Sequence, residues 1–218
     1  MDDAYTVQTT ALEAGEPEGV EQLQALKDGD LFLVADGWGD LKEGADGLFL
    51  NDTRILSRLT LKVGAARPSR LSSGVSRDNV AFTCHGTNRP LPPMGGHSAP
   101  AGVIHIERRR FLRDGRLFER VRLSNHGVED VLAPVAVEFA ADFADIFQVR
   151  GTVRLKHGLV HAPTDDGRRI HFRYTGLDAV ERTSCLSFSE PPARIAPGRA
   201  DFMFSLPRGK RVDLYLEC

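Results

Sequence analysis

The chain has 218 residues, of which 41% are hydrophobic and 27% are charged, and its formal net charge is −2 at pH 7. This length suits one large domain or two small ones, and the composition is that of a globular protein with a sizeable core. Charges this evenly balanced lack the basic excess of nucleic-acid binders. No apolar run reaches the roughly 18 residues that a membrane-spanning helix needs, so we expect neither nucleic acid nor membrane as a partner.

The N-terminal stretch of 26 residues contains several acids and no lysine or arginine. It lacks the basic start of a secretory signal, and Gly15, Pro17 and Gly19 disfavour a helix. We expect residues 1–26 to form a flexible acidic tail, with a short helix over residues 20–27 as the local alternative, and residues 27–218 to form one domain.

Three cysteines, Cys84, Cys185 and Cys218, are scattered without a CxxC pair. Neither a disulfide scaffold nor a zinc ribbon is expected from this pattern, which fits a reducing cytoplasm. His157 and His161 are four residues apart, but in a strand-like segment that does not suit a helical metal site. The sequence therefore implies no metal and no other cofactor.

Alternation of apolar and polar residues dominates the rest of the chain. Apolar residues take most odd positions of residues 55–63 and 131–139, and the same period recurs over residues 202–206 and 212–216. A period of two is that of a β-strand with one buried face. Pro134 predicts that its strand is bulged or lies at an edge, because proline cannot donate to a strand ladder.

Turn residues separate these runs. Asp114-Gly115 predicts a hairpin between residues 103–112 and 117–123, since this pair adopts positive φ at little cost. Asp166-Gly167 is expected to turn a strand at residues 153–161 back into the next one.

The segment 86–102 is rich in proline and glycine, so we expect a loop there, and only residues 141–149 offer another short helix. These patterns together predict an all-β fold, an antiparallel β-sandwich of the supersandwich kind with few short helices.

Paired acids follow the strand at residues 131–139. Asp142 and Asp145 lie three residues apart, and Arg150 follows them. Two carboxylates can flank a glycosidic bond, which makes this pair a candidate for glycoside hydrolysis. The alternative is structural, with the acids capping backbone N–H groups or pairing with arginines.

A second polar motif, Asp52-Thr53-Arg54, precedes the strand at residues 55–63. Asp52 with Asn51 suits a turn, and Arg54 can clamp a carboxylate bidentately. The interpretations are structural pairing, contact with a sugar hydroxyl, or contact with a neighbouring domain.

Two aromatic residues are candidates for sugar contacts. Trp38 is the only tryptophan and lies in the glycine-rich string ADGWGD, where it either stacks on a sugar or anchors a turn. Tyr174 is the second candidate. The one dense basic spot, residues 108–110, is expected to be a solvated strand end that pairs with Glu107 and Glu119.

Five stretches show a resemblance to a known family in order and spacing. They are GLFLNDTRILSRLTLKV (47–63), SSGVSRDN (72–79), RRRFLRDGRLFERVRLSN (108–125), VEFAADFADIFQVRG (137–151) and FRYTGLDAVERTSCLSF (172–188). Together they resemble the amino-terminal domain of bacterial and archaeal glycogen debranching enzymes of the amylo-α-1,6-glucosidase type. The resemblance implies a β-sandwich ahead of a helical (α/α)6 barrel that carries the catalytic carboxylates, so it assigns no catalytic residue to this chain.

The resemblance also maps family motifs onto Asp52, Thr53 and Arg54 and onto residues 141–151, with one departure at Gln148, where glutamate is expected in relatives. On this basis we expect a non-catalytic domain of an α-glucan-processing enzyme with the barrel as its partner. The strand-like run RVDLYLEC ends at Cys218, so we also expect that the chain is cut from a longer one. A stand-alone α-glucan-binding module is the alternative, and a hydrolase using Asp142 and Asp145 is a third. A bare barrel-facing surface could also produce a homo-oligomer.

Overall fold

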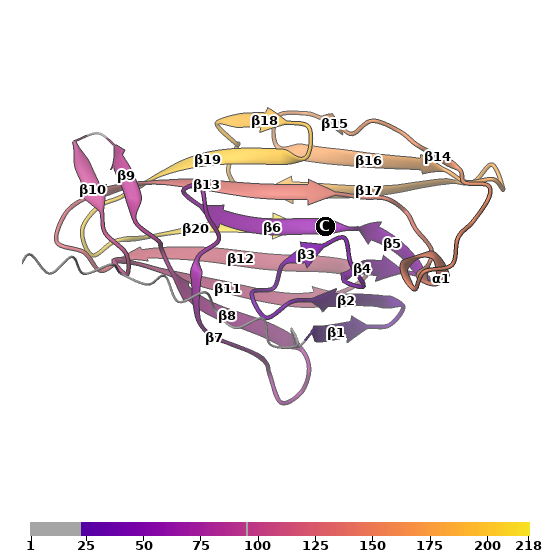
Figure 1. Cartoon of the computed structure of the whole chain (residues 1–218), viewed down its shortest axis with the longest axis horizontal. Coiled ribbons are helices and arrows are strands. Elements are labelled where there is room, and N and C mark those ends of the chain that lie inside the picture. Colours follow the sequence, from indigo (N-terminus) through magenta and orange to yellow (C-terminus); the bar gives the residue numbers. More distant parts are fainter. Residues whose placement is uncertain (1–22, 95) are drawn as a thin grey trace, which may run out of the picture.

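The computed structural model describes residues 23–94 and 96–218, which form a sandwich of antiparallel sheets with one short helix (Figure 1). This confirms the predicted all-β fold class. The structure contains no helix, among the residues it describes, with the length and hydropathy needed to cross a membrane.

One layer is a nine-stranded antiparallel sheet. In spatial order its strands are β14 (Leu159–Val160), β16 (Arg169–Thr175), β17 (Glu181–Phe188), β20 (Arg211–Glu217), β12 (Arg116–Asn125), β11 (Ile104–Arg113), β8 (Ala81–Thr87) and β7 (Ser69–Val75), and β15 (Thr164–Asp165) also pairs with β16.

The facing layer contains two smaller sheets, which lie in front of the large sheet in Figure 1. The five-stranded sheet has the order β18 (Arg194–Ala196), β19 (Arg199–Leu206), β13 (Val131–Ala140), β6 (Arg58–Val63) and β3 (Leu41–Lys42). The four-stranded sheet has the order β1 (Gln24–Asp28), β2 (Leu31–Ala35), β4 (Gly47–Leu50) and β5 (Thr53–Leu56). A two-stranded ribbon, β9 (Leu91–Met94) and β10 (His97–Ala99), and helix α1 (Ile146–Val149) complete the fold.

The core lies between the layers, where aromatic side chains meet from both sides. Phe139 of β13 contacts Phe172 and Phe188 of the large sheet, with ring centroids 6.0 and 6.5 Å apart. Phe188 also meets Phe202 of β19 edge-on at 5.3 Å. Burying each such ring stabilises the fold by roughly 1.5–3 kcal/mol, so these contacts hold the two layers together.

Alternation was a reliable guide in the longest strands. In β13 the odd positions from Val131 to Phe139 are all buried, as predicted. The expected edge or bulge at Pro134 is wrong, because β13 lies between β19 and β6 and its register with β19 continues through Pro134. The proline is accommodated just beyond the end of β6, where its carbonyl accepts from the Gly64 N–H at 2.8 Å. The Asp114-Gly115 hairpin is confirmed, with positive φ values of 51° and 72°.

Several predicted elements differ from the structure. Residues 55–63 are not one strand, because Leu56 and Ser57 are both buried in succession and the chain passes there from the four-stranded to the five-stranded sheet. Residues 153–161 form only the short β14, and α1 covers only part of residues 141–149. The segment 86–102 contains the ribbon β9–β10, since Leu91 and Ala99 are buried against the core.

The N-terminal prediction falls mostly on residues 1–22, which lie outside the described residues. The helix expected over residues 20–27 is wrong from Gln24 onward, because β1 begins there and pairs with β2. The burial of Leu26 explains this, as its side chain joins the core from a strand face. The sandwich therefore begins a few residues before position 27.

Candidate functional site

The first motif is organised around Arg54 on β5, whose side chain is only 7% exposed. Its Nε donates to Asp142 Oδ1 at 3.1 Å, and its Nη2 pairs with Asp142 Oδ2. Nη1 donates to the carbonyl oxygens of Gly44 at 2.7 Å and Asp46 at 3.1 Å. A two-pronged arginine–carboxylate pair fixes direction as well as distance. Arg54 therefore ties β5 to the chain leaving β13 and to the loop before β4.

Backbone hydrogen bonds join the two motif segments at the same place. The Arg54 N–H donates to the Ala144 carbonyl at 2.8 Å, and the Ile146 N–H donates to the Asp52 carbonyl at 2.9 Å. Segments about ninety residues apart in sequence thus share one short ladder. The structure brings the Asp52–Arg54 and Asp142–Asp145 motifs together through their backbones.

Asp145 is the N-cap of α1. Its Oδ1 accepts from the N–H groups of Phe147 at 2.9 Å and Gln148 at 3.0 Å, while the Gln148 side chain accepts from the Asp145 N–H at 3.0 Å. This is a capping box, and Asp145 Oδ2 also pairs with Arg154 at 2.6 Å. Burial acts to raise the pKa of Asp145, but the Gln148 N–H and Arg154 outweigh it and hold the pKa below its ordinary value. Asp145 is therefore ionised at neutral pH.

The other motif residues lie around the Arg54–Asp142 pair and the Asp145 cap. Asp52 is exposed in the tight turn after β4, with φ of 60°, and Thr53 forms an isolated bridge with Asp145. Arg150 ends α1 through its backbone, whose N–H donates to the Ile146 carbonyl at 3.1 Å. Within residues 23–94 and 96–218, the exposed Arg150 guanidinium forms no ion pair with Asp142 or Asp145.

An open cleft of about 320 Å³ lies beside the motifs and includes Tyr174 in its lining. The Tyr174 ring stacks on Phe143 with centroids 5.5 Å apart and planes 10° apart, and its hydroxyl accepts from the Gly158 N–H at 3.1 Å. Thr53 and Asp145 line the same cleft. One predicted sugar contact thus lies next to the motif residues.

Exposed apolar side chains surround this end of the sandwich, which we call the motif end. It comprises α1, the chain after it and the β16–β17 turn, on the right in Figure 1. The exposed apolar residues are Phe147 (59%), Val153 (86%), Leu155 (97%), Leu177 (68%) and Val180 (50%). Several exposed apolar side chains at one end of a domain suggest an interaction surface more strongly than scattered single ones do.

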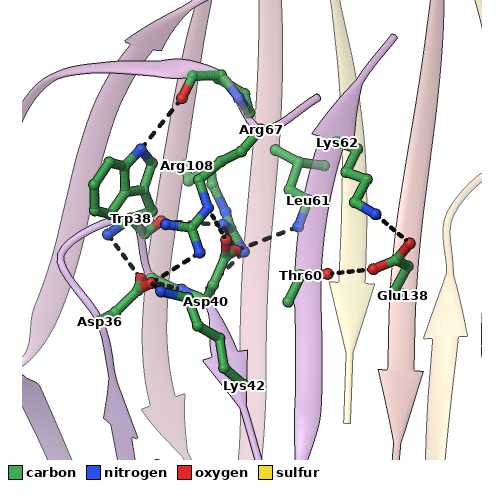
Figure 2. A network of polar contacts seen from close by, with 12 residues as sticks. Asp36, Trp38, Asp40, Lys42, Thr60, Leu61, Lys62, Arg67, Arg108 and Glu138 are labelled. Atoms are coloured by element: carbon green, nitrogen blue, oxygen red, sulfur yellow. Dashed lines mark hydrogen bonds and ion pairs between the residues drawn. The ribbon is translucent and has the colours of Figure 1, made fainter. Parts of the chain in front are cut away.

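Trp38 lies elsewhere, in the polar network between β2 and β3 that Figure 2 shows. Its indole N–H donates to the Pro68 carbonyl at 3.2 Å, and the guanidinium carbons of Arg67 and Arg70 lie 4.5 and 4.3 Å from the centre of its ring system. Cation–π contacts of this kind hold the ring in place. Trp38 and Tyr174 line different hollows, so the two predicted sugar contacts do not form one platform.

A buried charge cluster was missed from the sequence. Arg110 is fully buried and Arg108 is 5% exposed, so the expectation of a solvated strand end at residues 108–110 was wrong for both. Arg108 Nε pairs with Glu119 Oε1 at 2.7 Å, Arg110 Nη2 pairs with Glu119 Oε2 at 2.8 Å, and Arg108 also pairs with Asp40. The expected pairing with Glu119 does occur, but inside the core.

Parity was the signal that could have revealed this cluster. Arg108 and Arg110 occupy the same alternating positions of β11 as Ile104, Ile106 and Leu112, all of which are buried. Successive side chains of a strand point to opposite faces, so a strand whose even positions face the core buries these arginines too.

Two aspartates connect this cluster to the chain between β2 and β3. Asp36 Oδ1 accepts from the N–H groups of Trp38 and Asp40, both at 2.8 Å, and its Oδ2 pairs with Lys42 at 2.7 Å and Arg67 at 3.2 Å (Figure 2). Burial acts to raise the pKa of Asp36, but the Lys42 contact and the Asp40 N–H lower it below its ordinary value.

Glu119 is ionised for a similar reason. Burial acts to raise its pKa, but the adjacent Arg108 and Arg110 hold the pKa below the ordinary value. The cluster thus pairs buried charges of opposite sign and joins the β2–β3 turn to the large sheet.

The sequence model of the N-terminal domain of (some) glycogen debranching enzymes matches residues 26–217. This chain belongs to that family. The match includes both motif segments and the β11–β12 hairpin, so the resemblance drawn from the sequence is confirmed. No curated protein matches the chain.

Solved structures similar to this debranching-enzyme domain share little sequence with it. A protein named as an aldose 1-epimerase from Escherichia coli K12 has 8% identity and a TM-score of 0.48, over 90% of this chain and 97% of that one. A protein named as a kojibiose phosphorylase from the human microbiome has 9% identity and a TM-score of 0.47, over 79% of this chain and 23% of that one. A polysaccharide lyase has 13% identity and a TM-score of 0.35, over 91% of this chain and 32% of that one.

Proposed function

We propose that this chain is the non-catalytic N-terminal β-sandwich of a glycogen-debranching glycoside hydrolase of the amylo-α-1,6-glucosidase type. In that enzyme it packs on a helical catalytic domain and helps to shape the substrate cleft. Membership of the family over residues 26–217 supports the class of enzyme. The geometry of the motif acids supports a non-catalytic role.

The state of Asp145 carries this proposal. Glycoside hydrolysis needs one protonated carboxyl group as the acid and a second, ionised one, roughly 5–9.5 Å apart. Asp145 caps α1 and pairs with Arg154, and its lowered pKa makes it a poor proton donor at neutral pH. Asp142 is engaged by Arg54 on both oxygens. Both acids thus build the local structure, which favours placing the chemistry in another domain.

The motif end is the surface that we assign to the catalytic domain. It combines the family motif with exposed apolar side chains, of which Leu155 at 97% and Phe147 at 59% are prominent. Arg154 and Lys156 alternate with apolar residues along the same segment. Arg154 pairs with Asp145, whereas Lys156 is exposed and can reach the acidic surface of a partner. Burying this surface would place the capped turn at Asp145 against the neighbouring domain.

The test uses the enzyme that contains this domain. Replacing Phe147 and Leu155 together by serine should lower the unfolding temperature of the catalytic domain and reduce glucose release from an α-1,6-branched dextrin. The same double variant should leave the unfolding of the 218-residue chain unchanged, because both side chains are exposed. Val128→Ser is the matched control, since Val128 is 77% exposed in the β12–β13 turn, at the opposite end in Figure 1.

Three results would contradict the proposal. The first is a gene in which no helical catalytic domain accompanies this one. The second is an enzyme in which the Phe147 and Leu155 substitutions behave like Val128→Ser. The third is glucose release from α-1,6-linked oligosaccharides by the 218-residue chain alone, which should be abolished by Asp145→Asn if the motif acids were catalytic.

A further inference from the structure

An open groove with an aromatic floor lies on the outward face of the nine-stranded sheet. Its volume is about 570 Å³, within the range of roughly 300–1,000 Å³ typical of small-molecule sites. It shares no lining residue with the cleft at the motif end. The groove is therefore a separate feature of the domain.

The floor is built by cross-strand neighbours. Ala81 of β8, Phe111 of β11, Phe118 of β12 and Glu217 of β20 are successive partners across the sheet. The rings of Phe111 and Phe118 stack with centroids 5.1 Å apart and planes 16° apart. Rigid strands fix such a row more precisely than loops would.

Two aromatic side chains of the groove remain open to solvent. Phe111 is 38% exposed and Tyr215, on β20, is 51% exposed. Their strand neighbours Leu112 and Leu216 are buried on the other face of the sheet. Phe111 and Tyr215 therefore point away from the core. A phenylalanine and a tyrosine kept in the open within one groove present flat apolar faces to a ligand.

Polar groups rim the same floor. The Arg109 guanidinium is exposed and has no acceptor in the part of the chain that the structure describes, while Arg120 is held by Glu107. Ser187 supplies a hydroxyl on the far side, and Glu217 supplies a carboxylate whose Oε1 also pairs with the exposed Arg116 at 2.6 Å. Donors and acceptors thus stand at the edges of an aromatic floor.

We propose that this groove binds a neutral α-glucan chain, with pyranose rings stacked on Phe111 and Tyr215 and sugar hydroxyls bonded to Arg109 and Glu217. A pyranose ring has apolar C–H faces and a belt of hydroxyls, which matches a floor of aromatic carbon with a polar rim.

The choice of an α-glucan among pyranose chains rests on the proposed function. The groove and its aromatic residues are observed independently of that function. Sugar binding in the groove would hold a branched polymer at a site separate from the catalytic centre. Simultaneous engagement of two sites on one polymer raises the effective concentration of the second site.

Calorimetric titration of the 218-residue chain with maltohexaose tests the proposal. We expect saturable binding that Phe111→Leu and Tyr215→Ala each weaken roughly ten-fold. Phe111→Leu keeps an apolar side chain of similar size, so the fold is retained while the flat ring is lost. Phe32→Leu is the matched control, because Phe32 of β2 stacks on Phe49 at 4.6 Å outside the groove, and its binding should equal that of the wild type.

Absence of binding to maltohexaose would overturn the proposal, as would equal affinities in the Phe111→Leu and Phe32→Leu variants. Tighter binding of cellohexaose than of maltohexaose would overturn the choice of an α-glucan. Sedimentation that shows a dimer broken by Tyr215→Ala would assign the groove to a second copy of the chain instead. None of these results depends on Phe147 or Leu155, so the proposed role of the motif end is tested independently.

Discussion

Two arginine–carboxylate networks organise this domain, and they differ in their exposure to water. At the motif end, Arg54 is 7% exposed but its partner Asp142 is 39% exposed. In the charge cluster, Arg110 and Glu119 are 0% and 1% exposed. Water can replace a lost partner at the first site but not at the second, so the same pair of residue types has different energetic consequences.

The comparison separates the two tasks of paired charges in this fold. The charge cluster joins the β2–β3 turn to the large sheet and depends on ion pairs between buried charges. The motif network positions a surface and depends on geometry, through the Asp145 cap and the forked contact of Arg54. Substitutions in the two networks should therefore cause different losses of stability.

The largest effect is expected in the charge cluster. Glu119→Met leaves Arg110 buried without its carboxylate and should lower the free energy of unfolding by about 3–5 kcal/mol. Replacing Arg110 and Glu119 together by methionine removes both charges, while Arg108 keeps Asp40, and should restore most of that loss. Urea denaturation measures both variants. Equal stability of the wild type and Glu119→Met would show that the cluster is not coupled as described.

A smaller effect is expected at the motif network. Arg54→Ala leaves two carbonyl oxygens and Asp142 without their donor and should cost roughly 2–3 kcal/mol of unfolding free energy. Asp142→Asn retains an acceptor at a half-exposed position and should cost roughly 1 kcal/mol. The same denaturation series ranks them, and a loss from Asp142→Asn equal to that from Glu119→Met would remove the distinction between the two networks.

Acid should lower the stability of the charge cluster, because two of its carboxylates have lowered pKa values. The pKa values of Asp36 and Glu119 are lowered in the folded state, so the folded protein binds fewer protons than the unfolded chain in acid. Their contribution is complete above the ordinary pKa of 4.5 for glutamate and is lost as the pH falls through the lower, folded-state values. Thermal unfolding between pH 3 and pH 6 should show a shallower acid slope for the Arg110 and Glu119 double-methionine variant, and an unchanged slope would contradict this assignment.

The smallest effect is expected at Gln148, where relatives were expected to carry glutamate. Its side-chain oxygen accepts from the Asp145 N–H, a contact that glutamate makes equally well. Gln148→Glu should change the unfolding free energy by less than about 0.5 kcal/mol, whereas Asp145→Ala loses the cap and should cost about 1 kcal/mol. Hydrogen exchange at the α1 amides distinguishes the two, and equal protection in both variants would contradict the capping box.

Much of the sandwich could be predicted because period-two burial is a local signal. The strand around Val135 and the Asp114-Gly115 turn needed no information beyond neighbouring residues. The break at Ser57 could not be predicted this way, because the change of sheet depends on pairing with Ala140, far along the chain. The β9–β10 ribbon was not predicted, because the proline and glycine content of the segment indicates a loop. The burial of Leu91 and Ala99, which ties the ribbon to the core, is not visible in the sequence.

In the candidate site too, local sequence identifies some residues, while their partners depend on the fold. Arg54 and Asp145 stood out because polar residues beside a buried strand need partners, but their actual partners, Asp142 and Arg154, follow from the fold. The general rarity of buried arginine favours a solvated position for Arg108 and Arg110, whereas their strand parity with buried neighbours predicts the core position that the structure has. The groove around Phe111 was not anticipated, since its floor is assembled across several strands.

The position of Trp38 gives this protein an intrinsic spectroscopic reporter. As the only tryptophan, it dominates the ultraviolet emission, and its carbonyl accepts from Arg108 Nη1 at 3.0 Å, within the charge cluster. Its fluorescence will therefore follow the opening of that one junction between the layers. Trp38 is not among the residues that line the groove at Phe111 and Tyr215, so a silent emission spectrum on adding sugar does not mean an empty groove.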